Sequence, residues 1–250
     1  MSLLQEYRDN CFSLLNKYDN ILLIEPYGNV GDKLITESTL HILRSLNKTF
    51  THLRCDKVTP KDCKEKTVMW GGGGNMGDFY IHNRSQRDRI FPHCDDLVIL
   101  PQTWTSPEIV NGKKYVREIE SLNFTNGELA IDLSFGLSLQ YSEPSLDTGV
   151  FFRVKSEPTI IPNENIGDPA ELCHNPPQYI DLASNYKTIH TNRLHFAICG
   201  ILLGREVYLH SGRYFKNRSF YNTWLRELDN VHFIEDSTKV FGNFRRASPN

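Results

Sequence analysis

The sequence predicts an α/β fold with mostly parallel sheets, and two patterns in its 250 residues support this class. Short apolar runs alternate with segments of helical or loop character, as strands and their connections do in a parallel sheet. Two of the runs lead directly into glycine-rich segments, as strands do where a buried sheet ends beside a ligand. A polar stretch at residues 140–148 then marks a boundary between an N-terminal domain, residues 1–143, and a smaller C-terminal domain, residues 144–250.

The N-terminal elements follow from spacing and composition. Residues 3–17 carry apolar side chains at helical spacing, which predicts an opening helix. The run Ile21–Ile24 is expected to form a strand buried on both faces, since it has no polar residue. A glycine loop and a second helix, residues 34–46, follow it. Further strands are expected at residues 51–55, 67–70, 97–100 and 129–133.

The C-terminal elements alternate in the same way. The sequence predicts strands at residues 149–153, 188–189 and 206–210, and helices at residues 177–184, 194–203 and 220–228. Residues 163–177 read as loops. The tail after Asp236 is polar, so we expect it to be loosely ordered.

Composition narrows the classes of function. The 28 Lys and Arg against 30 Asp and Glu give a net charge of −2, which offers no electrostatic case for a nucleic-acid partner. No apolar run approaches the roughly 18 residues of a membrane span, and the start lacks a signal-peptide pattern. A cytoplasmic location is therefore expected. The six cysteines form no CxxC pair, and no pattern indicates a metal site.

Two glycine segments are candidate ligand loops. In residues 28–32, Asn29, Gly31 and Asp32 follow a buried strand, where backbone N–H groups can meet an anion, although Asp32 could simply cap the next helix. Residues 71–78 contain four consecutive glycines, each costing about 1 kcal/mol of chain freedom when ordered. A close approach of the backbone to a ligand would account for that cost. The residues of this segment that we expect at a ligand are Gly72, Gly73, Gly74, Asn75 and Asp78.

A cluster of basic groups forms the other candidate site. Arg193 and His195 stand at the start of a predicted helix, where anions bind, and Lys216 follows the next strand. An imidazole there can also move a proton near neutral pH. The plainer alternative is that Arg193 pairs with a carboxylate, the histidine caps the helix and Lys216 is a surface residue. Three further candidates lie near predicted strands: His190, Arg117 and Arg153. For Arg117 and Arg153, a plain surface or ion-pair role is an equal alternative.

With these residues in place, the chain resembles the polysaccharide pyruvyl transferases along nearly its whole length. The order and spacing of short motifs carry the resemblance, since each motif alone is loose. The motifs are GNVGDKLI at residues 28–35, GGGGNMGD at 71–78, Pro101-Gln102, REIES at 117–121, DLSF at 132–135, Arg193-Leu194-His195, and LLG at 202–204.

The resemblance implies a GT-B-like architecture, with two Rossmann-like halves facing a cleft. It also implies a transferase of exopolysaccharide or glycan biosynthesis, which moves a pyruvyl group from phosphoenolpyruvate onto a sugar and forms a pyruvate ketal. Phosphoenolpyruvate is a donor substrate, so no cofactor is expected. By the same resemblance the catalytic residues are His195 as acid or base, with Arg193 and Lys216 on the donor's carboxylate and phosphate.

The remaining candidates are assigned to substrate binding. They are Asn29, Gly31, Asp32, Gly72, Gly73, Gly74, Asn75, Asp78, Gln102, Arg117, Arg153 and His190. The expected partners are phosphoenolpyruvate and a sugar or glycan acceptor, and peripheral association with a membrane-bound polysaccharide pathway is compatible with the sequence. Two alternatives stay open: a GT-B-type glycosyltransferase that uses a nucleotide-sugar, and a non-catalytic glycan-binding subunit.

Overall fold

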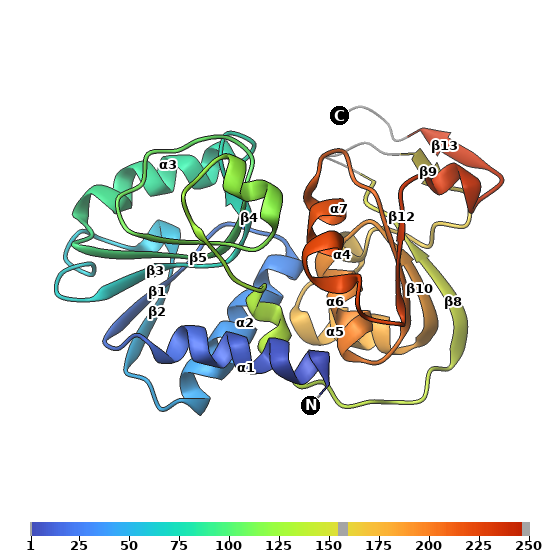
Figure 1. The fold of residues 1–250 in the computed structure, drawn as a ribbon, viewed down its shortest axis with the longest axis horizontal. Helices are drawn as coiled ribbons and strands as arrows, with labels where there is room; N and C mark the ends of the chain where they lie inside the picture. The colour runs from blue at the N-terminus through green and yellow to red at the C-terminus, as the bar shows by residue number, and fades with distance from the viewer. Residues whose placement is uncertain (1, 155–159, 247–250) are drawn as a thin grey trace. The chain divides into compact units, whose positions relative to one another are not determined.

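The structure is a computed structural model that describes residues 2–154 and 160–246 (Figure 1). The chain forms two compact units. The first contains Met1–Gly28 and Ile35–Leu137, and the second contains Asn29–Leu34 and Ser138–Asn250. Each unit is built on a parallel sheet with helices, so the predicted α/β class with mostly parallel sheets is confirmed.

The sheet of the first unit has seven strands in the order β2-β1-β3-β5-β6-β7, with β4 beside β5, and every pair is parallel. Its strands are β1 (Ile21–Glu25), β2 (Phe50–Arg54), β3 (Thr67–Trp70), β4 (Gly73–Met76), β5 (Asp96–Trp104), β6 (Lys113–Val116) and β7 (Glu128–Leu129). As its apolar run predicts, Ile21–Ile24 is buried throughout. The strand order reverses at β1, since β2 lies on one side and β3 on the other. Ligands of open α/β sheets bind at such a reversal.

The helices of this unit precede or connect its strands. They are α1 (Leu3–Asn16), α2 (Val30–Ser45) and α3 (Ile81–Ile90), with short 3₁₀ turns η1 (Cys55–Lys57), η2 (Phe91–His93), η3 (Ile119–Asn123) and η4 (Leu133–Gly136). Ser2 caps α1 by accepting a hydrogen bond from the Gln5 N–H. The core on one side of the sheet centres on Trp70, whose ring meets Phe91 edge-on at 5.4 Å.

The sheet of the second unit has four parallel strands in the order β12-β11-β10-β8. Its strands are β8 (Leu146–Phe151), β10 (Tyr186–Thr191), β11 (Glu206–His210) and β12 (Val231–Ile234). Each new strand is added at the same edge, and right-handed connections then bring all the helices to one face. Figure 1 shows α5 (Pro176–Ser184), α6 (Leu194–Leu202) and α7 (Lys216–Phe220) together on that face, with α4 (Pro169–Leu172) nearby.

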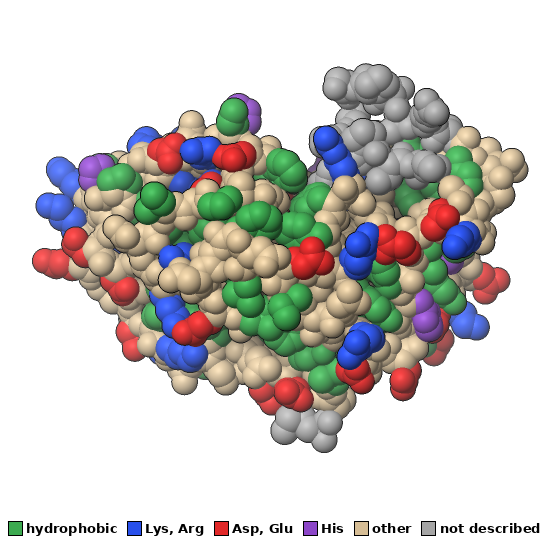
Figure 2. Space-filling model, turned by 45° about the horizontal axis from the view of Figure 1, so that its top comes forward, with side chains coloured by type: hydrophobic (Ala, Val, Ile, Leu, Met, Phe, Trp, Pro, Cys, Tyr) green, Lys and Arg blue, Asp and Glu red, His purple; other side chains and the backbone are tan. Residues whose placement is uncertain are grey.

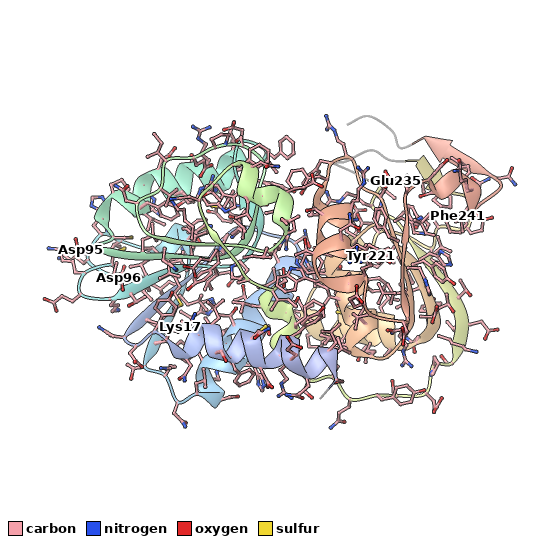
Figure 3. All side chains as sticks on the ribbon, viewed as in Figure 1. Lys17, Asp95, Asp96, Tyr221, Glu235 and Phe241 are labelled. Carbon is pink, nitrogen blue, oxygen red and sulfur yellow. The ribbon has the colours of Figure 1, made fainter. Side chains whose placement is uncertain are left out.

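The opposite face of this sheet carries aromatic and histidine side chains. His190 stacks on Tyr208 with ring centroids 4.4 Å apart, and Phe241 packs against both His190 and His210. Phe241 lies close to a two-stranded antiparallel pair, β9 (Ile160–Pro162) and β13 (Phe244–Arg246), as Figure 3 shows. The tail after Asp236 was expected to be loose. Its described part instead forms a 3₁₀ turn, Ser237–Lys239, and β13, because Phe241 anchors it; residues 247–250 lie outside the described residues.

Several predicted elements differ in the structure. The strand expected at residues 129–133 is wrong: β7 ends at Leu129, and Asp132 starts a 3₁₀ turn by accepting from the Ser134 N–H. The helix expected at residues 220–228 begins earlier, as α7, and continues as one π-helical turn, Tyr221–Leu225. No helix among the described residues is long and apolar enough to cross a membrane. On the face in Figure 2, Lys and Arg side chains are interspersed with Asp and Glu.

Candidate functional site

The N-terminus of α6 lies at the carboxyl edge of the second unit's sheet. Strand β10 ends at Thr191, whose Oγ1 accepts from the Arg193 N–H at 3.0 Å, and the helix begins at Leu194. The side chain of Arg193, the N-cap residue, makes no capping hydrogen bond to this terminus. The N-terminus of α6 places the positive end of the helix dipole at this sheet edge, and a helix N-terminus favours an anion.

His195 stands in the first turn of α6 and packs against the loop at residues 28–32. A Cβ atom on Gly31 would lie 2.8 Å from His195 Nδ1, so only glycine leaves room for the imidazole. Side chains of the loop itself fix its shape. Asn29 Oδ1 accepts from the Gly31 N–H at 2.8 Å, and Asp32 Oδ2 accepts from the Asn29 N–H at 2.9 Å. The fold thus joins two motifs that lie far apart in the sequence.

Arg193 is held by a buried carboxylate. Its Nε donates to Asp168 Oδ1 at 2.8 Å and its Nη2 to Asp168 Oδ2 at 2.5 Å, a bidentate pair. The Asp168 side chain is fully buried, whereas that of Arg193 is 13% exposed. Among the described residues, no hydrogen bond engages Nη1 of this guanidinium. The pair therefore fixes one edge of Arg193 and leaves the other edge to meet a ligand.

Two asparagines hold the neighbouring backbone. Asn192 Oδ1 accepts from the Arg153 N–H at 2.7 Å, which ties the end of β8 to the end of β10. Asn217 Nδ2 donates to Asn192 O and to His210 O, both at 2.9 Å. Lys216, the residue before Asn217, starts α7 with its Nζ 5.1 Å above the Tyr214 ring. Arg153, Lys216 and Arg193 therefore belong to neighbouring segments of one sheet edge.

His190 does not belong to this group. The structure places its ring on the opposite sheet face, where its Nδ1 shares a hydrogen bond of 3.1 Å with His210 Nε2. Its other ring contacts are Tyr208 and Phe241. Burial lowers the pKa of His190 to about 4, so the ring is neutral at neutral pH.

The glycine segment at residues 71–78 is not simply a loop, because Gly73–Met76 form β4. The close approaches that its glycines allow are to the protein's own atoms: a Cβ on Gly72 would lie 3.1 Å from both Ile35 Cγ2 and Pro101 O. Gln102 of β5 is fully buried, and its side chain donates to Gly71 O and accepts from the Asn75 N–H at 3.1 Å. Close packing of the protein's own atoms thus explains the glycines of this segment without requiring a ligand.

Arg117 lies in a buried network of charges in the first unit. Its Nη1 donates to Asp132 Oδ2 at 2.8 Å and its Nε to Thr103 Oγ1 at 2.9 Å, with Glu118 also close. A Cβ on Gly74 would lie 3.1 Å from Arg117 Nη2. Arg117 is only 1% exposed, so its surroundings are those of a structural ion pair. Desolvated pairs of this kind lose much stability when one partner is removed.

The structure therefore sorts the predicted residues into separate groups. In the second unit it gathers one set, which is Asn29, Gly31, Asp32, Arg153, Arg193, His195 and Lys216. A second set lies in the first unit: Gly72, Gly73, Gly74, Asn75, Asp78, Gln102 and Arg117. Sequence reasoning missed Asp168 and Asn217. An Asp-Pro pair before a short helix was the one available signal for Asp168, which caps α4.

A family model for polysaccharide pyruvyl transferases matches residues 29–209, from the Asn29 loop to Leu209 in β11. The chain belongs to the polysaccharide pyruvyl transferase family. The match includes both motifs that meet at the N-terminus of α6. Family membership makes the chain a transferase of polysaccharide biosynthesis and implies a sugar or glycan acceptor.

A solved structure supports the fold of this chain. A crystal structure of a functionally uncharacterised protein from Klebsiella pneumoniae is similar to it, with a TM-score of 0.76 and 22% sequence identity. The similarity covers 94% of this chain and 100% of the other. No curated protein sequence matches the chain significantly. Among the described residues, no three His, Cys, Asp or Glu side chains are grouped so that they could hold a metal ion.

Proposed function

We propose that the protein transfers a pyruvyl group from phosphoenolpyruvate to two hydroxyls of a sugar, forming a pyruvate ketal. Both hydroxyl oxygens bond to the central carbon of the donor, and the bond from that carbon to the phosphate oxygen breaks. One hydroxyl proton ends on the donor's methylene, which becomes a methyl group, and the other leaves with the phosphate. The step is redox-neutral, so it needs no oxidant, reductant or cofactor.

The observation that carries the proposal is the close packing of His195 against the loop at residues 28–32 at the N-terminal end of α6. An imidazole at this position can donate a proton to the methylene carbon or accept one from a sugar hydroxyl. Its ring is held by close packing against Gly31, which reduces the cost of orienting it for reaction. General acid–base catalysis by a positioned histidine fits the chemistry of ketal formation.

The donor carries a carboxylate and a phosphate, so it needs several positive groups. The helix terminus supplies N–H groups. The edge of the Arg193 guanidinium that Asp168 does not engage can donate hydrogen bonds to the carboxylate or to the phosphate of the donor. Arg153 and Lys216 lie on adjacent segments of the same sheet edge. We assign the donor to this edge of the second unit. A GT-B-like fold and a cytoplasmic location remain parts of the proposal.

Calorimetry with phosphoenolpyruvate tests the assignment. Wild-type protein is expected to bind it, and Arg193→Ala to bind it at least about tenfold more weakly, since a charge-assisted bidentate contact is lost. Arg226→Ala is the matched control, because Arg226 is an exposed arginine of the same unit that pairs with Glu227. UDP is the control ligand. Binding of UDP without binding of phosphoenolpyruvate would instead support a nucleotide-sugar glycosyltransferase.

A transfer assay tests the role of His195. Release of inorganic phosphate from phosphoenolpyruvate is measured with a panel of sugar acceptors. His195→Gln should abolish most of this release while phosphoenolpyruvate still binds, because the residue acts on protons and does not hold the donor. Phosphate release at the wild-type rate in this variant would remove His195 from the mechanism and favour a non-catalytic glycan-binding role.

A further inference from the structure

A cavity of about 780 Å³ lies in the first unit, formed by residues of α3, η2 and the segment that follows β5. A connection between parallel strands usually contains a helix that covers the sheet. The segment joining β5 to β6, residues 105–112, has none, so the flank of α3 is left open. The volume falls within the range of roughly 300–1,000 Å³ that is typical of small-molecule sites.

Apolar side chains form part of the cavity wall. Phe91 is fixed from behind by its edge contact with Trp70, and Pro92 follows it. Across from them the connecting segment contributes Pro107 and Ile109, and Ile109 is fully exposed to water. A fully exposed isoleucine that lines the same cavity as an aromatic ring gains by covering its surface with an apolar ligand face. The prolines and the packed ring lose little freedom when a ligand binds.

The cations of the cavity are already neutralised. Arg87, almost fully buried, pairs with Glu108 and also donates to Asn75 O at 2.7 Å. Arg84 pairs with Asp78. Nucleotides and phosphates need cations that are free to bind them, so these pairs argue against such ligands. A cavity of this kind favours a ligand with no net negative charge.

Two polar groups of the wall remain uncommitted. Among the described residues, no hydrogen bond or ion pair engages the side chains of Asp88 or Asn111, and both are exposed. The Asp88 carboxylate accepts hydrogen bonds, and the Asn111 amide both donates and accepts them. Together they match the neighbouring hydroxyl groups of a sugar. A purely aliphatic ligand would leave both groups desolvated without partners, at a cost in affinity.

From this chemistry we infer that the cavity is a second glycan-binding site, which takes a neutral sugar unit by its apolar ring face and its hydroxyls. The choice of a glycan rests on the proposed function, in which the acceptor is a sugar or a chain of sugars. The cavity wall is also joined to the glycine segment, because Glu108 Oε1 accepts from the Gly77 N–H at 3.0 Å.

Saturation-transfer NMR with linear hexasaccharides of glucose, galactose and mannose tests the site on the intact chain. At least one neutral hexasaccharide should bind, while oligogalacturonate, which is anionic, should bind more weakly. Asp88→Ala and Ile109→Ala should each weaken binding by about tenfold, the equivalent of one lost hydrogen bond or a similar apolar contact. Asp95→Ala is the matched control, an exposed aspartate next to the start of β5 (Figure 3) that does not line the cavity.

Binding that is unchanged in both cavity variants, or absent for all neutral hexasaccharides, would overturn the inference. Tighter binding of the anionic oligosaccharide would overturn the assigned ligand class. Asp88 and Ile109 are exposed, so their replacement should not unfold the protein, and circular dichroism would check this. Calorimetry with phosphoenolpyruvate does not depend on this cavity. A failure here with intact donor binding would therefore leave the proposed function standing.

Discussion

Replacing Asp168 by asparagine would remove the charge that holds Arg193 while keeping a side chain of nearly the same shape. The carboxylate is fully buried and accepts two hydrogen bonds from the guanidinium. It also accepts from the Ala170 N–H at 3.0 Å, a bond that the amide oxygen of asparagine can retain. The substitution therefore acts mainly on Arg193.

The expected loss of stability follows from burial. Breaking a fully buried ion pair costs about 3–5 kcal/mol, because one charge is left without a partner. Arg193 is 13% exposed and can turn part of its guanidinium toward water, so we expect about 1–3 kcal/mol for Asp168→Asn. The exposed pair between Arg218 and Glu235 provides a control. Glu235→Gln should cost less than about 1 kcal/mol, because solvent screens that pair (Figure 3).

Two assays separate stability from positioning. Urea unfolding gives the change in the free energy of unfolding, and calorimetry gives the dissociation constant for phosphoenolpyruvate. If Asp168 positions Arg193, Asp168→Asn should bind phosphoenolpyruvate about tenfold more weakly than the wild type in buffer without urea, where the variant is folded. A variant with wild-type stability and wild-type donor affinity would refute the argument that this carboxylate holds the arginine in place.

Three further outcomes follow from the same structure. Gly31→Ala should lower phosphate release by at least about tenfold, since its Cβ would displace the His195 ring, whereas Gly242→Ala, with no neighbour within 4 Å, should leave it unchanged. Burial lowers the pKa of His210 to about 3, below its unfolded value of about 6.5. The contribution of this neutral histidine to the free energy of unfolding should therefore be fully present above about pH 6.5 and should be lost as the pH drops toward 3. Urea unfolding at pH 7 and about pH 5 should show a loss of about 2 kcal/mol from this residue, and His210→Gln should reduce that dependence on pH. Arg117→Met should destabilise the protein in thermal unfolding, because it leaves buried acidic groups without their cation; an unchanged Tm would contradict this.

Local pattern was enough to predict the elements with a clear periodicity. The run Ile21–Ile24 is buried as expected, and α6 begins at Leu194 as its apolar run predicts. Helix α3 escaped prediction because few of its residues are apolar, and it buries Asn83 and Arg87 instead. Strand β4 escaped because glycine carries no side chain from which a strand pattern could be recognised.

The candidate site was only partly predictable for a similar reason. Arg193 and His195 could be singled out because both lie at a recognisable helix start. Their partners could not, since the contact of His195 with Gly31 and the pairing of Arg193 with Asp168 depend on tertiary structure. Arg117 was a substrate-binding candidate from sequence, yet its charge is shared within a buried network that spacing does not reveal.

The segment Asn29–Leu34 has a consequence for how this chain can be divided. It groups with the second unit, although the strand before it and most of α2 after it belong to the first. A single cut between Leu137 and Ser138 would therefore not yield two complete units, because the C-terminal piece would lack the segment Asn29–Leu34, which contains the glycine that packs against His195. Recombination that exchanges the C-terminal half between relatives must carry a matching loop from the other half, so the two regions are expected to be inherited together.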